Sequence, residues 1–284
     1  MPATPTSLAG YLAAVAQKAT LSATEKGVIA ISLKTLLTRL RAEFDKYDVS
    51  RLEAFGAFTR DTSLPPAMDR ESDVDVMAVF TEAGRKPAYF IEKLKQVALL
   101  HYPRPTVAHR GHSLYIELLH TRFDLVPALD SLRGLQIPDK RGDGWQPCED
   151  GGKALRQKDA QNAGLILPLL RLAKYWNARN EHPLEAFALE QRIAAHSFAM
   201  APKNLKAYFF DFMRGLSALP LADVAKAERV RALRRALDEI DRTAQGGDML
   251  GAVAKMEAIL PLPAAAARTA AGTGNPFLRR PPPG

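Results

Sequence analysis

The chain has 284 residues, of which 47% are hydrophobic and 25% charged, and its formal net charge is +8. This composition is typical of a soluble globular protein with one large or two modest domains. No run of about 18 apolar residues predicts a membrane span, and "MPATPTSLAG" lacks the pattern of a signal peptide. Cys148 is the only cysteine, which excludes an intrachain disulfide framework or a zinc cluster. We therefore expect a cytoplasmic protein with no membrane partner.

The positive excess is confined to the second half of the chain. Residues 1–150 have 19 basic and 19 acidic residues, so the surplus lies in residues 151–284. Part of it falls in "KAERVRALRRALDEIDR", residues 226–242, where arginines alternate with acids. This pattern favours a solvated helix face with ion pairs one turn apart. A surface for nucleic acid or another polyanion is the alternative, so a nucleic-acid partner stays open.

The first half of the chain predicts a mixture of helices and strands. Ser22 and Glu25 form a capping-box pattern, which starts a helix that runs to about Phe44. Pro87 opens a second helix that ends near residue 102. Strands are predicted over residues 50–58, 72–80, 106–111, 112–119 and 122–129, with a break at Gly56 and a hairpin turn at Gly111. Residues 137–147, "IPDKRGDGWQP", are expected to form a loop.

After residue 150 the pattern is helical. We expect helices over residues 153–179, 184–216, 221–243 and 247–259, with a kink or break at Pro168. The predicted domains are therefore residues 1–150, the catalytic core with its N-terminal helix, and 151–262, a helical lobe. Residues 263–284 form a flexible tail rich in proline and glycine. The expected class is α+β, with the active site in a cleft between the two lobes.

Two aspartates interrupt an otherwise apolar strand in "SDVDVMAVF", residues 72–80. Asp73 and Asp75 lie two residues apart, so both carboxylates project from one face of the strand, about 7 Å apart. Asp124 is a third acid framed by apolar residues in a strand. Three such acids predict a site for two Mg²⁺ or Mn²⁺ ions. The turn at Gly56 would supply backbone N–H groups near a triphosphate.

Three histidines are the competing candidates for metal ligands. His109, His112 and His120 are scattered through the strand-rich region that precedes Asp124. Their spacing matches no metal motif. We therefore expect surface or core histidines there.

Several motifs occur in the order found in one enzyme family. "GAFTRDT", residues 56–62, precedes the two aspartates, and Asp124 precedes "LVPAL". "IPDKRGDGW", "KYWN" and "AFALE" follow, at residues 137–145, 174–177 and 186–190. Across roughly residues 20–215 the chain resembles polymerase-β-like nucleotidyltransferases, and among them the CD-NTases, bacterial relatives of animal cyclic GMP–AMP synthase.

The resemblance implies roles for individual residues. It makes Asp73, Asp75 and Asp124 the metal ligands and catalytic residues, with Asp124 as the general base. It places Gly56, Ala57 and Thr62 beside the triphosphate. Lys174 would also reach the triphosphate, and Phe187 would stack on a base. The alternatives are a solvated Lys174 and a core position for Phe187.

Two residues depart from the family pattern. Ala57 and Ala186 stand where the family has serines whose hydroxyls hold phosphate oxygens. The triphosphate contacts therefore differ, and Thr59 and Thr62 are the nearby hydroxyls that can compensate. Because the acids are intact, we do not expect a dead enzyme.

The family implies an enzyme that joins NTPs into a cyclic di- or trinucleotide messenger for antiphage defence of the CBASS type. A terminal nucleotidyltransferase acting on RNA or protein, and a non-catalytic nucleotide sensor, are the alternatives. The resemblance also implies that a ubiquitin-E1/E2-like partner conjugates the terminal residue, Gly284, to a target. A tail without a role is the alternative to that hypothesis.

Overall fold

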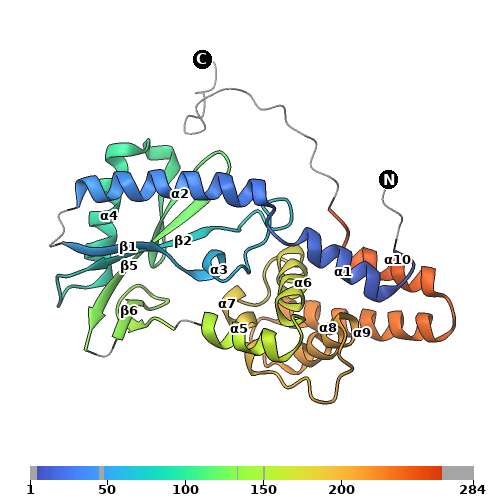
Figure 1. The fold of residues 1–284 in the computed structure, drawn as a ribbon. Helices are drawn as coiled ribbons and strands as arrows, with labels where there is room; N and C mark the ends of the chain where they lie inside the picture. The colour runs from blue at the N-terminus through green and yellow to red at the C-terminus, as the bar shows by residue number, and fades with distance from the viewer. Residues whose placement is uncertain (1–4, 45–47, 133, 150, 264–284) are drawn as a thin grey trace. The chain divides into compact units, whose positions relative to one another are not determined.

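The computed structural model describes residues 5–44, 48–132, 134–149 and 151–263, which divide into two compact units. The sheet unit contains residues 22–44, 48–61, 72–132 and 134–149 of the described chain. The helical unit contains residues 5–21, 62–71 and 151–263. Figure 1 shows the elements of both. The predicted tail, including Gly284, lies almost entirely outside the described residues.

A mixed seven-stranded sheet forms the centre of the sheet unit. Its strands are β1 Val49–Ala54, β2 Val74–Phe80, β3 Val107–Arg110, β4 Ser113–Glu117, β5 Arg122–Ser131, β6 Gly134–Pro138 and β7 Trp145–Pro147. The order is β1-β2-β5-β4-β3, with β6 paired to β5 and β7 to β6. Strands β2 and β5 are parallel neighbours, and the other pairs are antiparallel. The predicted α+β class is confirmed.

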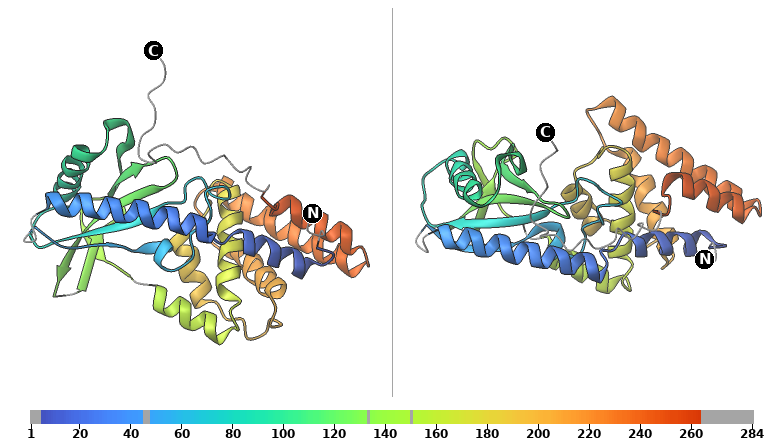
Figure 2. Two further views of the ribbon diagram at one scale, coloured as in Figure 1. Left: turned by 45° about the horizontal axis from the view of Figure 1, so that its top comes forward. Right: turned by 90° about the horizontal axis from the view of Figure 1, so that it is seen from above.

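Two long helices pack on this sheet (Figures 1 and 2). Helix α2, Ala23–Glu43, contacts β1 and α4, and α4, Pro87–His101, contacts β3, β4 and β5. The predicted capping box at Ser22 and Glu25 is present. Phe80 of β2 and Phe90 of α4 bring their ring centroids to 4.6 Å in the core between helix and sheet. Apolar burial therefore fixes β2, the strand that holds Asp75.

The predicted loop over residues 137–147 is wrong at both ends. Pro138 and Trp145 are register partners in the β6–β7 hairpin, and only residues 139–144 form its turn. Trp145 donates from Nε1 to the Arg85 carbonyl at 2.9 Å and packs edge-on against Phe90. A proline is tolerated here because strand ends and edges leave its missing N–H unneeded.

The helical unit is built around one apolar core, in which Leu169, Leu189, Phe209 and Leu237 are fully buried. Its longer helices are α1 Leu8–Lys18, α5 Gly152–Gln161, α6 Ile166–Arg179, α7 Ala186–Ala195, α8 Leu205–Gly215, α9 Val224–Gln245 and α10 Met249–Ile259. The sequence pattern did not predict α1. Its buried face packs against α6, α8 and α10. The structural units therefore differ from the predicted domains, because residues 5–21 and 62–71 pack with the helical unit.

One helix break lies away from its predicted position, and a second break was not predicted. The break between α5 and α6 falls at Ala163 and Gly164, which both have positive φ. Pro168 instead occupies the first turn of α6, where a missing N–H costs nothing. The single helix predicted for residues 184–216 is divided by residues 196–204, and Asn204 caps α8 through Ala207 N–H. The α9 and α10 helices match their predictions with small shifts.

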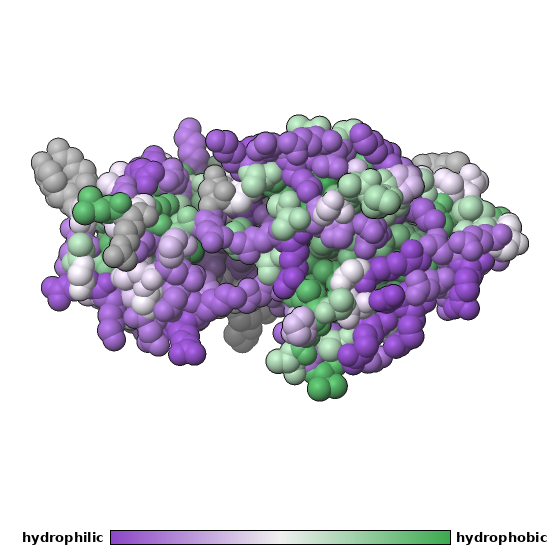
Figure 3. Space-filling view, turned by 90° about the horizontal axis from the view of Figure 1, so that it is seen from below, coloured by the Kyte–Doolittle hydropathy of each residue, from purple (hydrophilic) through white to green (hydrophobic). Residues whose placement is uncertain are grey.

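The hydropathy of one face and the ion pairs of α9 describe the surface of the molecule. Figure 3 shows one face, on which hydrophilic residues predominate. No helix in the described part of the chain is long and apolar enough to span a bilayer. On α9, Arg231 and Arg235 both pair with Glu228, and Arg229 pairs with Glu181. These contacts favour the solvated, ion-paired helix face over a polyanion surface.

Candidate active site

The three predicted acids lie on two neighbouring strands of the sheet unit. Asp73 directly precedes β2, Asp75 is the second residue of β2, and Asp124 is the third residue of β5. Asp75 and Asp124 are register partners in the parallel β2–β5 pair. Residues two apart on a strand share a face, as do register partners on adjacent strands. The sequence therefore folds so that the three carboxylates share one face at the amino ends of the two strands.

The cluster is electrostatically unfavourable without a cation. Burial, and after it the charges of Asp73 and Asp124, raise the pKa of the Asp75 carboxyl from 3.8 to about 7. The Arg60 guanidinium and the backbone N–H of Ala57 act in the opposite direction on this pKa but do not offset the rise. Like charges in a partly buried site disfavour the ionised form. A divalent cation near these oxygens would relieve that repulsion.

The acids fit a hard divalent metal by their chemistry. Carboxylate oxygens are the ligands that Mg²⁺ and Mn²⁺ prefer, and the charges of Asp73 and Asp124 both act to raise the pKa of Asp75. Among the described residues, no three aspartate, glutamate, histidine or cysteine side chains lie close enough together to hold one metal ion between them. Mg²⁺ is usually held by one or two carboxylates together with water and substrate phosphates, so a site of this kind does not need three protein ligands around one ion.

Gly56 packs directly against Asp75. Its φ is +72°, and a Cβ added there would lie 1.9 Å from Oδ2 of Asp75. Phe55 N–H also donates to the backbone carbonyl of Asp75 at 3.0 Å. Only glycine satisfies both the conformation and the close approach. The glycine segment, which we define as residues 56–62, therefore begins in contact with the acid cluster.

The threonine hydroxyls of the glycine segment are used inside the protein. Thr59 donates from Oγ1 to the Gly56 carbonyl at 3.0 Å. Thr62 is fully buried and donates from Oγ1 to Oε1 of Glu190 at 2.8 Å. In this conformation both hydroxyl hydrogens are donated to acceptors within the protein. Their compensation for the missing serines at positions 57 and 186 stays a prediction.

The remaining predicted residues lie in the helical unit. Lys174 is a buried residue of α6, 7% exposed, so the solvated alternative is wrong. Phe187 lies half-buried in the first turn of α7, outside the residues of the apolar core, so the core alternative is not supported. A Cβ added at Gly151 would lie 3.5 Å from the Phe187 ring. The predicted contacts of Lys174 with phosphate and of Phe187 with a base stay predictions.

The three histidines belong to other elements than the acids, which precede or lie on β2 and β5. His109 belongs to β3, His112 to the β3–β4 turn and His120 to the β4–β5 turn. His109 and His120 are exposed.

Sequence reasoning assigned no role to Arg60 or Glu190. Arg60 follows Gly56 by one helical turn and acts on the pKa of Asp75. Glu190 ends the "AFALE" motif and forms an ion pair with Lys174. Its place in that motif was the available signal, but its partner sixteen residues earlier on another helix could not be inferred from the sequence.

Comparison of the sequence with known protein families identifies the family of this chain. The domain family described as Second Messenger Oligonucleotide or Dinucleotide Synthetase (SMODS) matches residues 7–157, more than half of the chain. The chain belongs to this family. The predicted resemblance to the CD-NTases is thereby confirmed.

Two groups of CD-NTases illustrate the relationship. The CBASS oligonucleotide cyclase CdnC of Escherichia coli strain KTE188 is 29% identical in an alignment of 217 residues that covers 66% of this chain and 65% of that relative. The match thus spans less than two thirds of that relative. The structure of E. coli MS115-1 CdnC with ATP has a TM-score of 0.68 and 14% identity, covering 89% of this chain and 97% of that one. Bradyrhizobium diazoefficiens CdnG with GTP gives a TM-score of 0.63 at 14% identity, covering 88% and 97%. The fold is therefore that of the CD-NTases.

Proposed function

We propose that this protein is a metal-dependent nucleotidyltransferase that joins NTPs into a cyclic di- or trinucleotide and releases pyrophosphate. The observation that carries the proposal is the triad of carboxylates on β2 and β5, with Gly56 packed against one of them, in a SMODS chain. The ATP bound to CdnC and the GTP bound to CdnG support nucleoside triphosphates as the substrates.

In this proposal Asp73, Asp75 and Asp124 hold two Mg²⁺ or Mn²⁺ ions. When bound, the ions activate a hydroxyl for attack and stabilise the charge that develops on the leaving oxygen. Asp124 accepts the proton of the attacking 2′- or 3′-hydroxyl. A bond forms from that oxygen to the α-phosphorus, and the bond from the α-phosphorus to the oxygen of the leaving pyrophosphate breaks. A second round within the linear product closes the ring.

The glycine segment and Phe187 provide the substrate contacts in this scheme. At Gly56 the absence of a side chain lets a phosphate approach the backbone beside Asp75. Phe187, partly exposed on α7, offers a ring on which a base can stack. The product would act as a messenger in antiphage defence of the CBASS type, and the protein would work in the cytoplasm.

Terminal nucleotidyl transfer and nucleotide sensing are the two alternative functions, and they differ in the acceptor and the turnover that they require. A terminal nucleotidyltransferase needs an RNA or protein acceptor, and its support, the basic helical region, is weakened by the ion pairs of α9. A nucleotide sensor needs no turnover, and the alanines at positions 57 and 186 are its support.

Purified protein incubated with labelled NTPs and Mg²⁺ or Mn²⁺, with and without RNA, separates the three functions. Cyclisation predicts pyrophosphate release and a phosphatase-resistant product in the absence of any acceptor. Product that requires RNA favours terminal transfer. Nucleotide binding without pyrophosphate release favours the sensor.

The tail carries a separate proposal about a partner. We propose that Gly284, which lies outside the described residues, is conjugated to a target by a ubiquitin-E1/E2-like protein. Co-expression with such a partner should give a species of higher mass that Gly284→Glu abolishes. A species that persists in the variant, or is absent with the wild type, contradicts the proposal.

A further inference from the structure

Three polar side chains form a buried node in the helical unit, and none of them belongs to the acid cluster. The node consists of Thr62, Lys174 of α6 and Glu190 of α7, which are 0%, 7% and 4% exposed. The Lys174 ammonium lies 2.5 Å from Oε1 of Glu190. It also donates to the backbone carbonyl and to Oγ1 of Thr62, both at 3.1 Å.

The side-chain donors of the node all have acceptors. An ammonium has three N–H donors, and Lys174 has three acceptors within hydrogen-bond distance. The Thr62 hydroxyl accepts from Lys174 and donates its own hydrogen to Glu190 at 2.8 Å. A buried ammonium without a counter-charge is strongly unfavourable. Glu190 is therefore the group that allows Lys174 to be buried beside Thr62.

The node holds the end of the glycine segment opposite to Gly56. Thr62 is the last residue of that segment and is held by both its carbonyl and its hydroxyl. Along the segment, Arg60 N–H donates to the Gly56 carbonyl at 3.3 Å. Asp61 pairs with Lys26 at 2.8 Å. The segment is thus fixed at one end by Asp75 and at the other by the node.

We propose that Glu190 is a positioning residue of the nucleotide site: through Lys174 and Thr62 it fixes the glycine segment that packs on Asp75. This inference rests on the proposed nucleotidyl transfer. It gives Glu190 an indirect role, since it acts through Lys174 and makes no contact with substrate. It also predicts that the lysine and the glutamate work as one unit, so that losing either has similar consequences.

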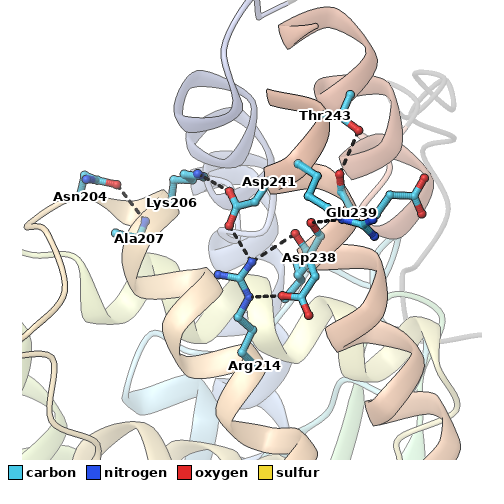
Figure 4. Close-up of polar contacts among 10 residues, drawn as sticks. Asn204, Lys206, Ala207, Arg214, Asp238, Glu239, Asp241 and Thr243 are labelled. Carbon is cyan, nitrogen blue, oxygen red and sulfur yellow. Dashed lines mark hydrogen bonds and ion pairs between the residues drawn. The ribbon is translucent and has the colours of Figure 1, made fainter. Parts of the chain in front are cut away.

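A purely structural ion pair is the alternative, and the chain offers a matched control for it. Asp241 of α9 lies in the same unit, is 19% exposed and pairs with Lys206 and Arg214 at 2.6 Å each (Figure 4). Its position on a different pair of helices, α8 and α9, separates it from the node. Asp241→Asn therefore breaks partly buried charge pairs without touching the glycine segment.

The experiment compares Glu190→Gln, Thr62→Val and Asp241→Asn with the wild type. For each, kcat and KM for NTPs, the Kd of a non-hydrolysable ATP analogue and Tm are measured, with kinetics well below the lowest Tm. We expect Glu190→Gln and Thr62→Val to lower kcat/KM by about tenfold or more, the size typical of groups that orient a functional residue. Asp241→Asn should lower Tm while leaving kcat/KM within about twofold.

A double variant tests whether the two residues act together. If Glu190 acts through Lys174, the kcat/KM of Lys174→Met with Glu190→Gln equals that of Lys174→Met alone. Additive losses contradict the inference, as does a Glu190→Gln enzyme with normal kcat/KM, or failure of both node variants to fold. A wild type without turnover defeats the proposed function instead, and the Kd series then decides whether the node positions bound nucleotide.

Discussion

The acid cluster of the sheet unit and the node of the helical unit solve opposite electrostatic problems. In the cluster three like charges share one face of β2 and β5, and the pKa of Asp75 rises to about 7. In the node a single cation is matched by Glu190, and every donor of Lys174 has an acceptor. The charges of the node are balanced within the chain, whereas the like charges of the cluster are relieved by a bound cation or by a proton on Asp75. This contrast favours the cluster as the proposed catalytic site.

Removing the charge of the cluster should have the largest effect. Asp73→Asn combined with Asp75→Asn is expected to reduce pyrophosphate release to a trace, because the metal ligands are lost. The same change removes charges that repel each other, so Tm of the metal-free protein should not fall and can rise. Circular dichroism melting and a pyrophosphate assay check both parts. More than trace activity would show that other residues hold the metal.

Adding a side chain at Gly56 should be the next most damaging change. Gly56→Ala forces a Cβ to within 1.9 Å of Oδ2 of Asp75 at a φ of +72°, which should cost about 1–3 kcal/mol of stability and most of the activity. Gly27→Ala is the matched control. Gly27 lies inside α2 with nothing within 4 Å of an added Cβ, so alanine should stabilise there by about 0.5–1 kcal/mol. Equal effects at both positions would contradict the close packing of Gly56 on the acid.

The sequence predicted the acid cluster better than the node, for a physical reason. The spacing of Asp73 and Asp75 fixes their common face through the two-residue period of a strand. The capping box at Ser22 is equally local and is present in the structure, where Asp75 is also the register partner of Asp124. Lys174 and Glu190 meet because α6 packs against α7. No periodicity within either helix encodes that meeting.

The errors in the helices have a similar origin. Judged by residue type, Pro168 is a stronger helix breaker than Ala163 or Gly164. The break nevertheless lies at Ala163 and Gly164, where the backbone takes positive φ. A proline in the first turn needs no hydrogen-bond donor, so its position within the helix decides its effect. Helix α1 escaped prediction because its buried face becomes evident only against α6, α8 and α10.

Phe187→Ala distinguishes the contribution of the helical unit to substrate binding from its contribution to stability. Since Phe187 is half-exposed and outside the apolar core, Tm should change little. Loss of base stacking should weaken nucleotide binding by about 1–3 kcal/mol. Equilibrium binding of a labelled NTP and thermal melting give the two quantities. A large fall in Tm with unchanged affinity would assign the ring to packing.

The smallest effect concerns the pH dependence of stability in the metal-free protein. The pKa of Asp75 in the folded protein, about 7, lies above the ordinary value of 3.8, so between these pH values the folded state holds a proton that the unfolded chain has released. The stabilisation is present at low pH and is lost as the pH rises through about 7. The Tm of the wild type should therefore be lower near pH 8 than near pH 5.5. This fall in Tm should be larger for the wild type than for Asp75→Asn, which lacks the titrating carboxyl. Equal pH profiles for the two proteins would contradict the raised pKa.

The central claim is that the acid cluster joins NTPs to one another, and the mass of the product tests it most directly. Wild type and the Asp73→Asn, Asp75→Asn variant are incubated with all four NTPs and Mg²⁺ in the absence of any acceptor, and the products are identified by mass spectrometry. The account predicts a cyclic product from the wild type alone. Its mass equals that of two or three nucleoside monophosphates less one water for each phosphodiester bond, including the one that closes the ring, and it has no terminal phosphate. A linear product, the same product from the variant, or unchanged NTPs would contradict it.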